Sequence, residues 1–534
     1  MFDSLNFPYT SKRVPIYAKK GMVATSNPLA SQIGVDILKK GGNAVDAAVA
    51  VAASLTVLEP TSNGIGGDAF AIVYKDGKIY GLNASGYAPR NLTVEKLKSK
   101  GYEKIPSHSW ESVTVPGAPA AWATLSKEFG ELPLEALLEP AIDYANEGFP
   151  VSPVTAKSWE RAFNIYKKEL KEEISKAWFD VFAPEGRAPG VGEIWSSKLH
   201  AQTLESIAES DANSFYNGKL AEKIVEFSNK TGGYISKEDL EDYEPIWVEP
   251  LSVNYRGYDV WELPPNGQGI IVLMALNILK EFHFQCKEYS ESYHKQIEAL
   301  KLAFVDGLKY ITDISDMKVK IEDLLSEKYA SERRKLIGKE ALLPEAGDPY
   351  SGGTVYFATA DEYGNMVSYI QSNYMGFGSG IVVPDTGISL QNRGVSFSLN
   401  EEDNNCLKPL KRPYHTIIPG FLTKDGNAIG PFGVMGGYMQ PQGHLQFLMN
   451  LIDFNLNPQA ALDAPRWQWI KEKEIIVEKA FPTYILETLE NKGHKIKVSL
   501  NSSEFGRGQF IYRNDEGVLI GGTEPRADSN IACF

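Results

Sequence analysis

One pair of neighbouring residues could supply both a nucleophile and its base. Gly353 and Thr354 stand where charged, turn-forming sequence meets an apolar run that continues to Ala360. If the chain is cut between them, Thr354 gains a free α-amine with a pKa of about 7.7 to 8.0 beside its hydroxyl. Base and nucleophile then belong to one residue. Gly353 has no side chain to obstruct attack of the hydroxyl on its carbonyl, so the pair is compatible with self-cleavage, although Thr is also ordinary at the start of a strand.

A second candidate is the glycine pair Gly436-Gly437, which precedes an expected helix from Gly443 to Phe454. Backbone N–H groups at such a turn are not obstructed by a Cβ and can hold a developing oxyanion, each donor contributing roughly 3 kcal/mol. A purely structural turn explains the same two residues. The pair therefore gains weight only if a nucleophile lies beside it.

A third glycine-rich segment contains Gly64, Gly66 and Gly67. Glycines let backbone amides approach an anion closely. However, the expected order here is helix, glycines, strand, whereas phosphate-binding loops run strand, glycines, helix, and GxxxxGK[ST] is absent from the sequence. Tight backbone packing is the preferred interpretation of this turn.

Rival catalytic and metal chemistries find little support. The seven histidines are scattered, no GxSxG elbow occurs, and His415 is the one histidine expected near a site. The three cysteines, Cys286, Cys406 and Cys533, form no CxxC or Cys/His cluster at metal-ligand spacing. We therefore expect no metal and no cofactor.

Composition limits the partners and the location. Of the 534 residues, 43% are hydrophobic and 23% charged, as in a globular protein, and the net charge of -14 argues against nucleic acid or anionic lipid as a partner. Met1 to Gly21 lacks the apolar run of a secretory signal. The apolar runs Ala47 to Leu58 and Ile270 to Leu279 are shorter than a membrane span. A cytoplasmic protein is expected.

The elements around these candidates can be predicted from apolar periodicity. A helix from Pro28 closes at Lys39 to Gly42, and Asn43 can cap a second helix, Ala44 to Leu58. A hairpin follows over 69–74 and 79–82. Further helices are expected at 120–129, 134–147, 197–209, 220–231 and 293–306, and a strand at Val253 to Leu263.

The sequence pattern changes from charged and weakly periodic to strand-like after residue 350. Lys318 to Gly347 is charged and weakly periodic, and with the turn-forming sequence Asp348 to Gly353 it predicts an exposed, mobile connector. Thr354 to Ala360 and Met366 to Ser372 then predict a hairpin, and another is expected over 509–512 and 517–521.

At these residues the sequence resembles the γ-glutamyltranspeptidase family of N-terminal nucleophile hydrolases over nearly its whole length. The matching segments are Met22 to Ala24, Gly41 to Ala47, Leu58 to Pro60, Gly64 to Gly67, Val115 to Gly117, Pro264 to Gly269, Glu298 to Asp306, Thr354 to Asp361, Gly364-Asn365 and Phe377 to Gly380. The order and number of these matches make the resemblance specific.

The resemblance implies an α+β fold, a four-layer αββα sandwich, and a proenzyme that cleaves itself between Gly353 and Thr354. The segments 1–353 and 354–534 would stay associated as a heterodimer and form one catalytic unit. Thr354 would be nucleophile and base, Ser372 would hydrogen-bond the nucleophile, and Gly436 and Gly437 would form the oxyanion pair. The family's asparagine that positions the amine falls on Tyr374, and the nearby amide, Asn373, is the candidate for this catalytic role.

The departures from the family pattern concern the substrate. Tyr414-His415-Thr416 stands where the transpeptidases carry a serine pair that holds the glutamyl carboxylate. Ser85 aligns with the clamp arginine and Ser396 with the acid that grips the α-amino group. Arg90 and Arg393 lie close by in sequence and are possible replacements. The candidate substrate-binding residues are Arg393, Tyr414, His415 and Tyr438.

Three functions are compatible with these residues. The first is hydrolysis of γ-glutamyl amides such as glutathione through an acyl-enzyme, with transfer to water or an amine. The second is an acylase of the same family that acts on other small-molecule amides, such as glutaryl or cephalosporin-like compounds. The third, of another class, is a non-catalytic scaffold that retains the fold.

Overall fold

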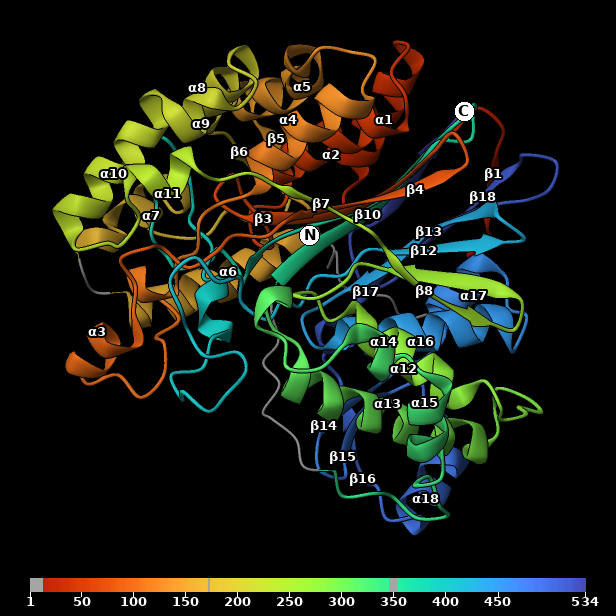
Figure 1. Cartoon of the computed structure of the whole chain (residues 1–534). Coiled ribbons are helices and arrows are strands. Elements are labelled where there is room, and N and C mark those ends of the chain that lie inside the picture. Colours follow the sequence, from red (N-terminus) through yellow and green to blue (C-terminus); the bar gives the residue numbers. More distant parts are fainter. Residues whose placement is uncertain (1–12, 171–172, 345–352) are drawn as a thin grey trace.

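Two seven-stranded antiparallel sheets lie face to face at the centre of the computed structural model, which describes residues 13–170, 173–344 and 353–534 (Figure 1). Helices cover the outer face of each sheet, so the layers run helix, sheet, sheet, helix. The four-layer sandwich expected from the sequence is therefore confirmed.

The first sheet carries the predicted nucleophile strand at its centre. β10 (Gly353–Asp361) pairs with β2 (Gly21–Thr25) on one side and β11 (Met366–Tyr374) on the other. The remaining strands are β3 (Asp68–Lys75), β4 (Lys78–Ala84), β7 (Ile246–Val248) and β19 (Asn530–Cys533), in the order β19-β2-β10-β11-β3-β4-β7. The hairpins β3–β4 and β10–β11 match the sequence prediction.

The second sheet has the order β1-β18-β17-β13-β12-β9-β8. Its strands are β1 (Ile16–Ala18), β18 (Leu519–Thr523), β17 (Arg507–Arg513), β13 (Asn427–Met435), β12 (Gly420–Lys424), β9 (Tyr258–Glu262) and β8 (Leu251–Tyr255). The single strand predicted over 253–263 is wrong, because the chain turns back at Arg256 and Gly257, whose φ values are 54° and 86°. Two positive φ values are the signature of a tight hairpin turn.

The helical layer on the first sheet begins with the two predicted helices, α1 (Pro28–Lys39) and α2 (Ala44–Leu58). Asn43 and Asp46 form a capping box at the start of α2, and every residue of α2 is buried. Its small side chains let it lie between α1, α5 and the sheet. The other helices of this half are α3 (Val94–Ser99), α4 (Ala118–Phe129), α5 (Leu134–Glu147), α6 (Pro153–Glu169), α7 (Lys176–Phe182), α8 (Lys198–Glu209), α9 (Asn213–Asn217), α10 (Lys219–Thr231) and α11 (Lys237–Glu241), with the short strands β5 (Phe149–Pro150) and β6 (Ile194–Trp195).

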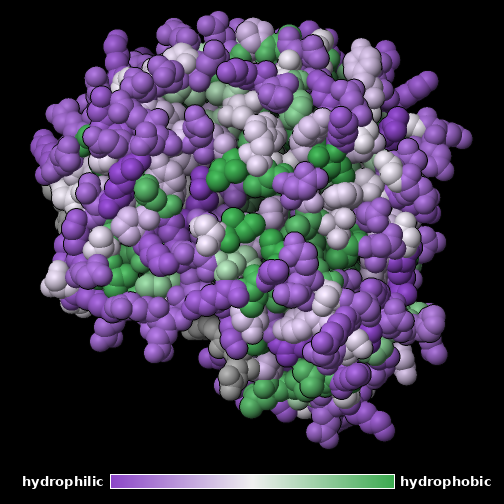
Figure 2. All heavy atoms as spheres, in the orientation of Figure 1, coloured by the Kyte–Doolittle hydropathy of each residue, from purple (hydrophilic) through white to green (hydrophobic). Residues whose placement is uncertain are grey.

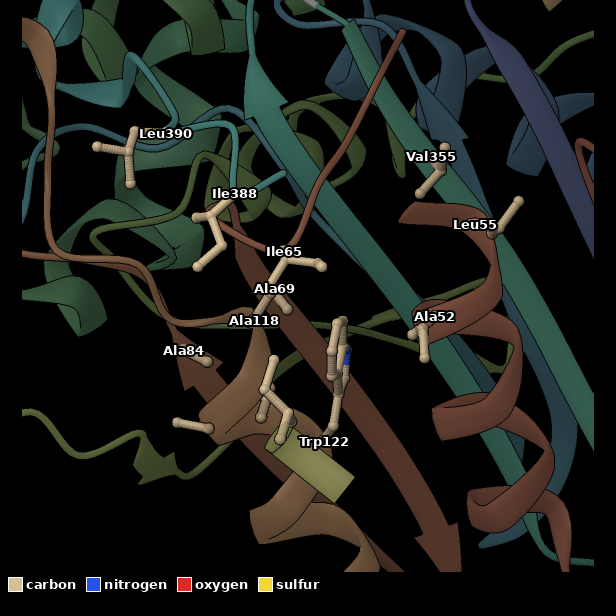
Figure 3. Packing of buried hydrophobic residues seen from close by; sticks show 14 of the residues in the cluster. Ala52, Leu55, Ile65, Ala69, Ala84, Ala118, Trp122, Val355, Ile388 and Leu390 are labelled. Atoms are coloured by element: carbon tan, nitrogen blue, oxygen red, sulfur yellow. The ribbon is translucent and has the colours of Figure 1, made fainter. Parts of the chain in front are cut away.

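The core between this layer and the sheet joins segments that are far apart in sequence. Figure 3 shows Trp122 of α4 near Ala69 of β3, with Ala52 and Leu55 of α2 and Val355 of β10 at one side. The Trp122 indole N–H also donates to Oε1 of Gln371 on β11 at 3.0 Å. The layer is therefore attached to the sheet by apolar packing and by a buried hydrogen bond.

The second helical layer contacts β8, β9, β13, β17 and β18. It consists of α12 (Gly269–Leu279), α16 (Met439–Ile452) and α17 (Pro458–Asp463), with α13 (Ser290–Tyr310) outside them. α16 begins before the predicted Gly443, because Pro441 falls in its first turn, where a missing N–H costs nothing. A small sheet of β14 (Trp467–Lys471), β15 (Glu474–Glu478) and β16 (Lys495–Ser499) packs with α18 (Thr483–Asn491) at the periphery.

The predicted mobile connector is wrong for residues 318–344. This segment forms α14 (Ile321–Leu324) and α15 (Glu327–Arg334), and buries Leu324 and Ala330. Arg333 pairs with Asp306 on α13, and Arg334 Nε donates to the carbonyl of Ile278 at 2.8 Å. The arginines that looked like an exposed charge run therefore anchor the segment to α12 and α13. Residues 345–352, which include the end of the predicted connector and most of the turn-forming sequence from Asp348 to Gly353, lie outside the described residues.

Surface chemistry is mainly polar. Figure 2 shows that hydrophilic residues dominate this face of the molecule, with apolar residues gathered in a few groups near its centre and lower end. Among the residues that the structure describes, no helix combines the length and apolar character needed to cross a membrane.

Candidate active site

The hydroxyl groups of Thr354 and Ser372 meet across β10 and β11. Thr354 Oγ1 donates to Ser372 Oγ at 3.2 Å, and both side chains are buried. They continue the alternation of Tyr356 and Ile370, which face the second sheet. The ladder shifts between Gly353 and Val355, so Thr354 lies at an irregularity of the strand pair. The structure thus brings the predicted nucleophile and its predicted hydrogen-bond partner together.

Tyr374 closes this end of β11 in a strained conformation. Its φ is +75°, and its backbone N–H donates to Ser372 Oγ at 2.7 Å. A non-glycine residue in the left-handed region costs on the order of 1–3 kcal/mol, and such strain clusters at functional sites. Tyr374 also pairs with Gly353 in the ladder. It therefore lies against the bond predicted to be cut.

Asn373 does not lie with Thr354, and this corrects the sequence expectation. Successive side chains of a strand point to opposite faces, so Asn373 points away from the face of Ser372. A Cβ added to Gly67 would lie 2.9 Å from Asn373 Oδ1, and one added to Gly64 would lie 3.0 Å from Nδ2. The amide therefore packs on the glycine turn on the helical side of the sheet.

The glycine turn itself is a packing element, as the sequence predicted. A Cβ on Gly66 would lie 2.3 Å from the carbonyl oxygen of Ser389. The Gly66 carbonyl accepts from the N–H of Gln391, and the Gly67 carbonyl from that of Gly117. Backbone groups of the turn are thus engaged by neighbouring segments of the protein.

The turn Gly436-Gly437 lies at the same end of the sandwich as Thr354. Across the two sheets, Ser368 reaches the carbonyl of Phe432, and the Tyr356 ring lies against Gly433. Ser368 is paired with Ala358, so Phe432 lies near Ala358 and the next residue, Gly433, lies near Tyr356. The chain of β13 therefore runs toward Gly436 in the direction in which β10 runs back toward Thr354. The two glycines have φ values of +132° and +62°. Neither of their amide N–H groups donates a hydrogen bond within the described part of the chain.

Gln268 holds this turn, a role that the sequence alone did not suggest. Its Nε2 donates to the carbonyls of Gly437 at 3.0 Å and Thr416 at 2.6 Å, and its Oε1 accepts from the Tyr414 hydroxyl at 2.9 Å. Gln268 is fully buried. The available signal was its place in the motif Pro264 to Gly269, which matched the family without suggesting a function.

A buried charged cluster lies beside Ser372, and its acid was not predicted either. Asp68 is the residue opposite Ser372 in the β3–β11 register. Arg393 donates to the Asp68 carboxylate from Nε at 3.3 Å and from Nη2 at 3.4 Å, and to Thr416 Oγ1 from Nη1 at 2.8 Å. His415 Nε2 lies 2.6 Å from Asp68 Oδ2. The signal for Asp68 was a charged residue at the start of an otherwise apolar strand.

The protonation states of this cluster follow from its contacts. Burial raises the pKa of Asp68, but the Arg393 charge and the His415 contact outweigh it and leave the pKa below its usual range. Burial, together with Arg393, lowers the pKa of His415 to about 4. Its Nδ1 accepts the Ile417 N–H at 3.3 Å, so a neutral His415 donates from Nε2 to Asp68. The cluster therefore holds one negative and one positive charge at neutral pH.

Three tyrosines complete the region. The Arg393 guanidinium lies 4.5 Å from the centre of the Tyr374 ring. The rings of Tyr414 and Tyr438 stack with centroids 5.9 Å apart. Burial is the main cause that raises the pKa of both Tyr414 and Tyr438, so both hydroxyls stay protonated. The four predicted substrate-binding residues, Arg393, Tyr414, His415 and Tyr438, are thus brought into one region.

Other residues considered from the sequence lie elsewhere or have other contacts. Arg90 pairs with Asp239 and Asp242, away from Asp68. Ser85 joins the amides of Asn83 and Asn266, and its carbonyl accepts from Arg412 Nε. Ser396 Oγ donates to the carbonyl of Arg393. Of the two arginines proposed as replacements for the clamp, the structure places Arg393 in the site.

One group of possible metal ligands was not anticipated. His294, Glu298 and His494 have ligand atoms within 4.8 Å of one another. Lys301 donates to Glu298 Oε1 at 2.7 Å, and the two imidazoles are joined at 2.9 Å. The groups form a buried polar network between α13 and the peripheral sheet, in which His494 Nδ1 has no hydrogen-bond partner among the described residues.

Comparison with known proteins agrees with this geometry. The family described as Gamma-glutamyltranspeptidase matches residues 30–534. The solved structure of a cephalosporin acylase from Bacillus halodurans is 61% identical, with a TM-score of 0.98, and the match covers 100% of this chain and 99% of that one. The Glutathione hydrolase-like YwrD proenzyme of Bacillus subtilis (strain 168) is 38% identical over 96% of this chain and 98% of its own length.

A third relative is the Glutathione hydrolase proenzyme of Escherichia coli (strain K12), which is 34% identical over 96% of this chain and 91% of its own length. These relatives carry different activities in their names, and all are enzymes. The match of the family extends through both sheets and both helical layers. The chain therefore belongs to the γ-glutamyltranspeptidase family of enzymes.

Proposed function

We propose that this protein cuts its own chain between Gly353 and Thr354 and then hydrolyses amide bonds with Thr354 as the N-terminal nucleophile. The observation that carries the proposal is the hydrogen bond from Thr354 Oγ1 to Ser372 Oγ, at the start of the central strand β10. The pair also lies directly beside the bond predicted to be cut, because Gly353 is paired with Tyr374, two residues after Ser372.

The cutting step uses groups that lie at this position. Thr354 Oγ attacks the Gly353 carbonyl carbon, its proton passes to the amide nitrogen, and the peptide bond becomes an ester. Water then hydrolyses the ester, which leaves a carboxylate on Gly353 and a free α-amine on Thr354. The strained Tyr374, paired with Gly353, supports this assignment.

The two segments are expected to stay together after the cut. β11 and all of β10 except Gly353 belong to 354–534, yet they pair with β3 and β2, which belong to 1–353. β19 likewise pairs with β2. Separation of the segments would break ladders in the middle of a buried sheet, so a heterodimer is the expected product.

Turnover would proceed through an acyl-enzyme. The α-amine of Thr354 takes the proton from its own hydroxyl, and the oxygen attacks the substrate carbonyl carbon. The N–H groups of Gly436 and Gly437 would stabilise the oxyanion. The amine product leaves with a proton, and water or an amine releases the acyl group from the ester. No cofactor takes part in these steps.

Two substrate classes are compatible with this chemistry. Relatives named as glutathione hydrolases favour the γ-glutamyl amides expected first from the sequence. The likeness to a cephalosporin acylase favours an acylase. The contacts of Asp68 favour it too, because its carboxylate is already paired with Arg393 and His415, whereas binding of a glutamyl group would need unpaired charged partners.

A denaturing gel with N-terminal sequencing tests the proposal. Two fragments, 1–353 and 354–534, with the smaller beginning Thr-Val-Tyr-Phe, are expected. Thr354→Ala should remain one piece and be inactive, whereas Thr359→Ala, a change elsewhere on β10, should still be cut. An uncut chain that hydrolyses amides would contradict the proposal.

A further inference from the structure

We propose that Gln268 is a positioning residue for amide hydrolysis, because its side chain fixes the Gly436-Gly437 turn relative to the segment 414–416. The N–H groups of the turn would then face the oxyanion without first having to reorient. This role rests on the proposed acyl-enzyme chemistry of Thr354. It goes beyond that chemistry by assigning control of the rate to a buried residue that acts through the turn.

The glycine turn has little rigidity of its own. Gly436 and Gly437 have φ values of +132° and +62°, and a glycine backbone rotates more freely than that of other residues. The Gly436 carbonyl accepts from the Met439 N–H at 3.1 Å, and the Gly437 carbonyl from the Gln440 N–H at 3.1 Å. Both bonds span three residues, a pattern with poorer geometry than that of an α-helix. A hydrogen bond from outside the turn therefore adds a restraint that the turn itself does not supply.

The backbone of Gln268 is well placed to provide this restraint. Gln268 is fully buried and directly precedes α12, in which every residue is buried. Its backbone N–H donates to the His415 carbonyl at 3.0 Å, and its own carbonyl accepts from the Ile271 N–H at 3.1 Å. The side chain thus extends from a fixed point in the core toward a turn that is flexible by composition.

The side-chain amide of Gln268 joins two parts of the site. Its two N–H donors bind the carbonyls of Gly437 and Thr416, and its oxygen accepts from the Tyr414 hydroxyl. An amide side chain has two N–H donors, so both are used. The Thr416 hydroxyl in turn accepts from Arg393. One amide therefore sets the spacing between the proposed oxyanion donors and the segment that carries predicted substrate-binding residues.

The contact with Gly437 restrains the N–H groups of the turn. Peptide groups are planar units joined at Cα, so holding the peptide group that follows Gly437 limits rotation of the group that carries its N–H. Oxyanion donors stabilise the transition state more than the bound substrate, and a misplacement of about 1 Å can lower a rate about a hundredfold. Loss of the Gln268 contact should therefore lower kcat and leave KM nearly unchanged.

The test is Gln268→Met, which removes the donors and the acceptor at similar side-chain volume. The probes are γ-glutamyl and glutaryl p-nitroanilide, and kinetics are measured on the self-cleaved enzyme with the one that the parent hydrolyses faster. We expect kcat to fall about tenfold to a hundredfold, with KM changed less than about threefold. If this variant does not fold, Gln268→Asn takes its place, because it keeps a polar amide but is one carbon too short to hold both carbonyls.

Gln446→Met is the matched control. Gln446 is also buried, and its Nε2 donates to the carbonyls of Gln442 at 3.0 Å and Trp467 at 2.8 Å, while its Oε1 accepts from the Trp467 N–H at 3.0 Å. It thus makes the same kinds of bond on α16, more than two helical turns after Gly437. Urea unfolding should show a similar loss of stability in the two variants, whereas kcat should fall only in Gln268→Met.

A double-mutant cycle with Gly436→Ala separates action through the turn from a general effect on the fold. Where the turn is already displaced, Gln268→Met should lower kcat by less than about threefold further, because residues that act through one element are not additive. A full additional loss would overturn the inference. So would an unchanged kcat in Gln268→Met, a change confined to KM, or an equal fall of kcat in Gln446→Met.

Failure of the wider proposal gives a different result. If the parent hydrolyses neither anilide, or if Thr354→Ala hydrolyses them, the acyl-enzyme proposal fails and the role of Gln268 fails with it. If Thr354→Ala is inactive and Gln268→Met retains the kcat of the parent, the acyl-enzyme proposal stands and the role of Gln268 is wrong.

Discussion

Asp68 and Ser372 stand opposite each other on β3 and β11, so the carboxylate of the charged cluster and the hydroxyl partner of Thr354 share one rung of the sheet. The nucleophile and the charged cluster are therefore held by neighbouring strands of one buried ladder. Such strands move little relative to each other, which suits a site that must align a scissile bond and later a substrate.

Ser372→Ala should slow self-cleavage and reduce kcat about tenfold to a hundredfold, because Thr354 loses the group that orients its oxygen. Cleavage half-time on denaturing gels and anilide hydrolysis measure the two effects. Ser368→Ala is the control, since Ser368 is equally buried on the same face of β11 but contacts Tyr356. If Ser372→Ala cleaved itself with the same half-time as the parent, Ser372 would have no role in the cleavage mechanism.

Gly436→Ala should lower kcat by about a hundredfold or more, because its φ of +132° does not suit an L side chain and the N–H groups of the turn would shift. A Cβ at this position would also lie 3.1 Å from Gly506 Cα. Gly426→Ala has a comparable backbone strain, at φ +79°, in open space in the β12–β13 turn. Equal activity in the two variants would argue against an oxyanion role.

Asn373→Ala should leave self-cleavage within about threefold of the parent, because the amide lies on the Gly64–Gly67 turn and not beside Thr354. The free energy of unfolding should fall by about 1–2 kcal/mol from the space left in the turn. Gel analysis and urea unfolding separate the two effects. Loss of cleavage with unchanged stability would restore the catalytic role expected from the sequence.

Acid should destabilise the protein through His415. Its pKa is about 4 in the folded state against about 6.5 when unfolded, so the unfolded state binds the proton first as pH falls. The free energy of unfolding contributed by the neutral imidazole is fully present above about pH 6.5 and is lost as pH falls from 6.5 to 4. This contribution is on the order of 3 kcal/mol for a fully buried group.

Urea unfolding at pH 7 and pH 5 should therefore show a smaller pH effect in His415→Gln than in the parent. His200, whose pKa burial also lowers to about 4, is the control. His200→Gln should reduce the pH effect similarly while leaving amide hydrolysis intact, because it lies with Trp195 and Phe182 among the helices. An unchanged pH effect in His415→Gln would show that this histidine titrates normally.

Local features of the sequence were sufficient for most elements near the site. The glycines after Lys40 predicted the end of α1, and Asn43 predicted the start of α2. Alternating apolar residues predicted the β10–β11 hairpin. Caps, turns and pleats can be predicted in this way because they depend on residues a few positions apart. The chemistry of Gly353-Thr354 was also local, since the nucleophile and its prospective base are one residue. The prediction of a mobile connector over 318–344 was wrong because the contacts that order this segment are not local. Arg333 and Arg334 bind partners on α13 and α12.

The charged cluster could be found only in the folded chain. Asp68 and Arg393 are separated by 325 positions and Asp68 and His415 by 347, so no local pattern links them. Likewise, the face on which Asn373 lies is set by the pleat and by the packing of the glycine turn against β11. The sequence by itself determined which residue can act as a nucleophile, because that property is covalent. The tertiary structure decided what surrounds it, because burial and long-range pairing set the charge and shape that a substrate meets.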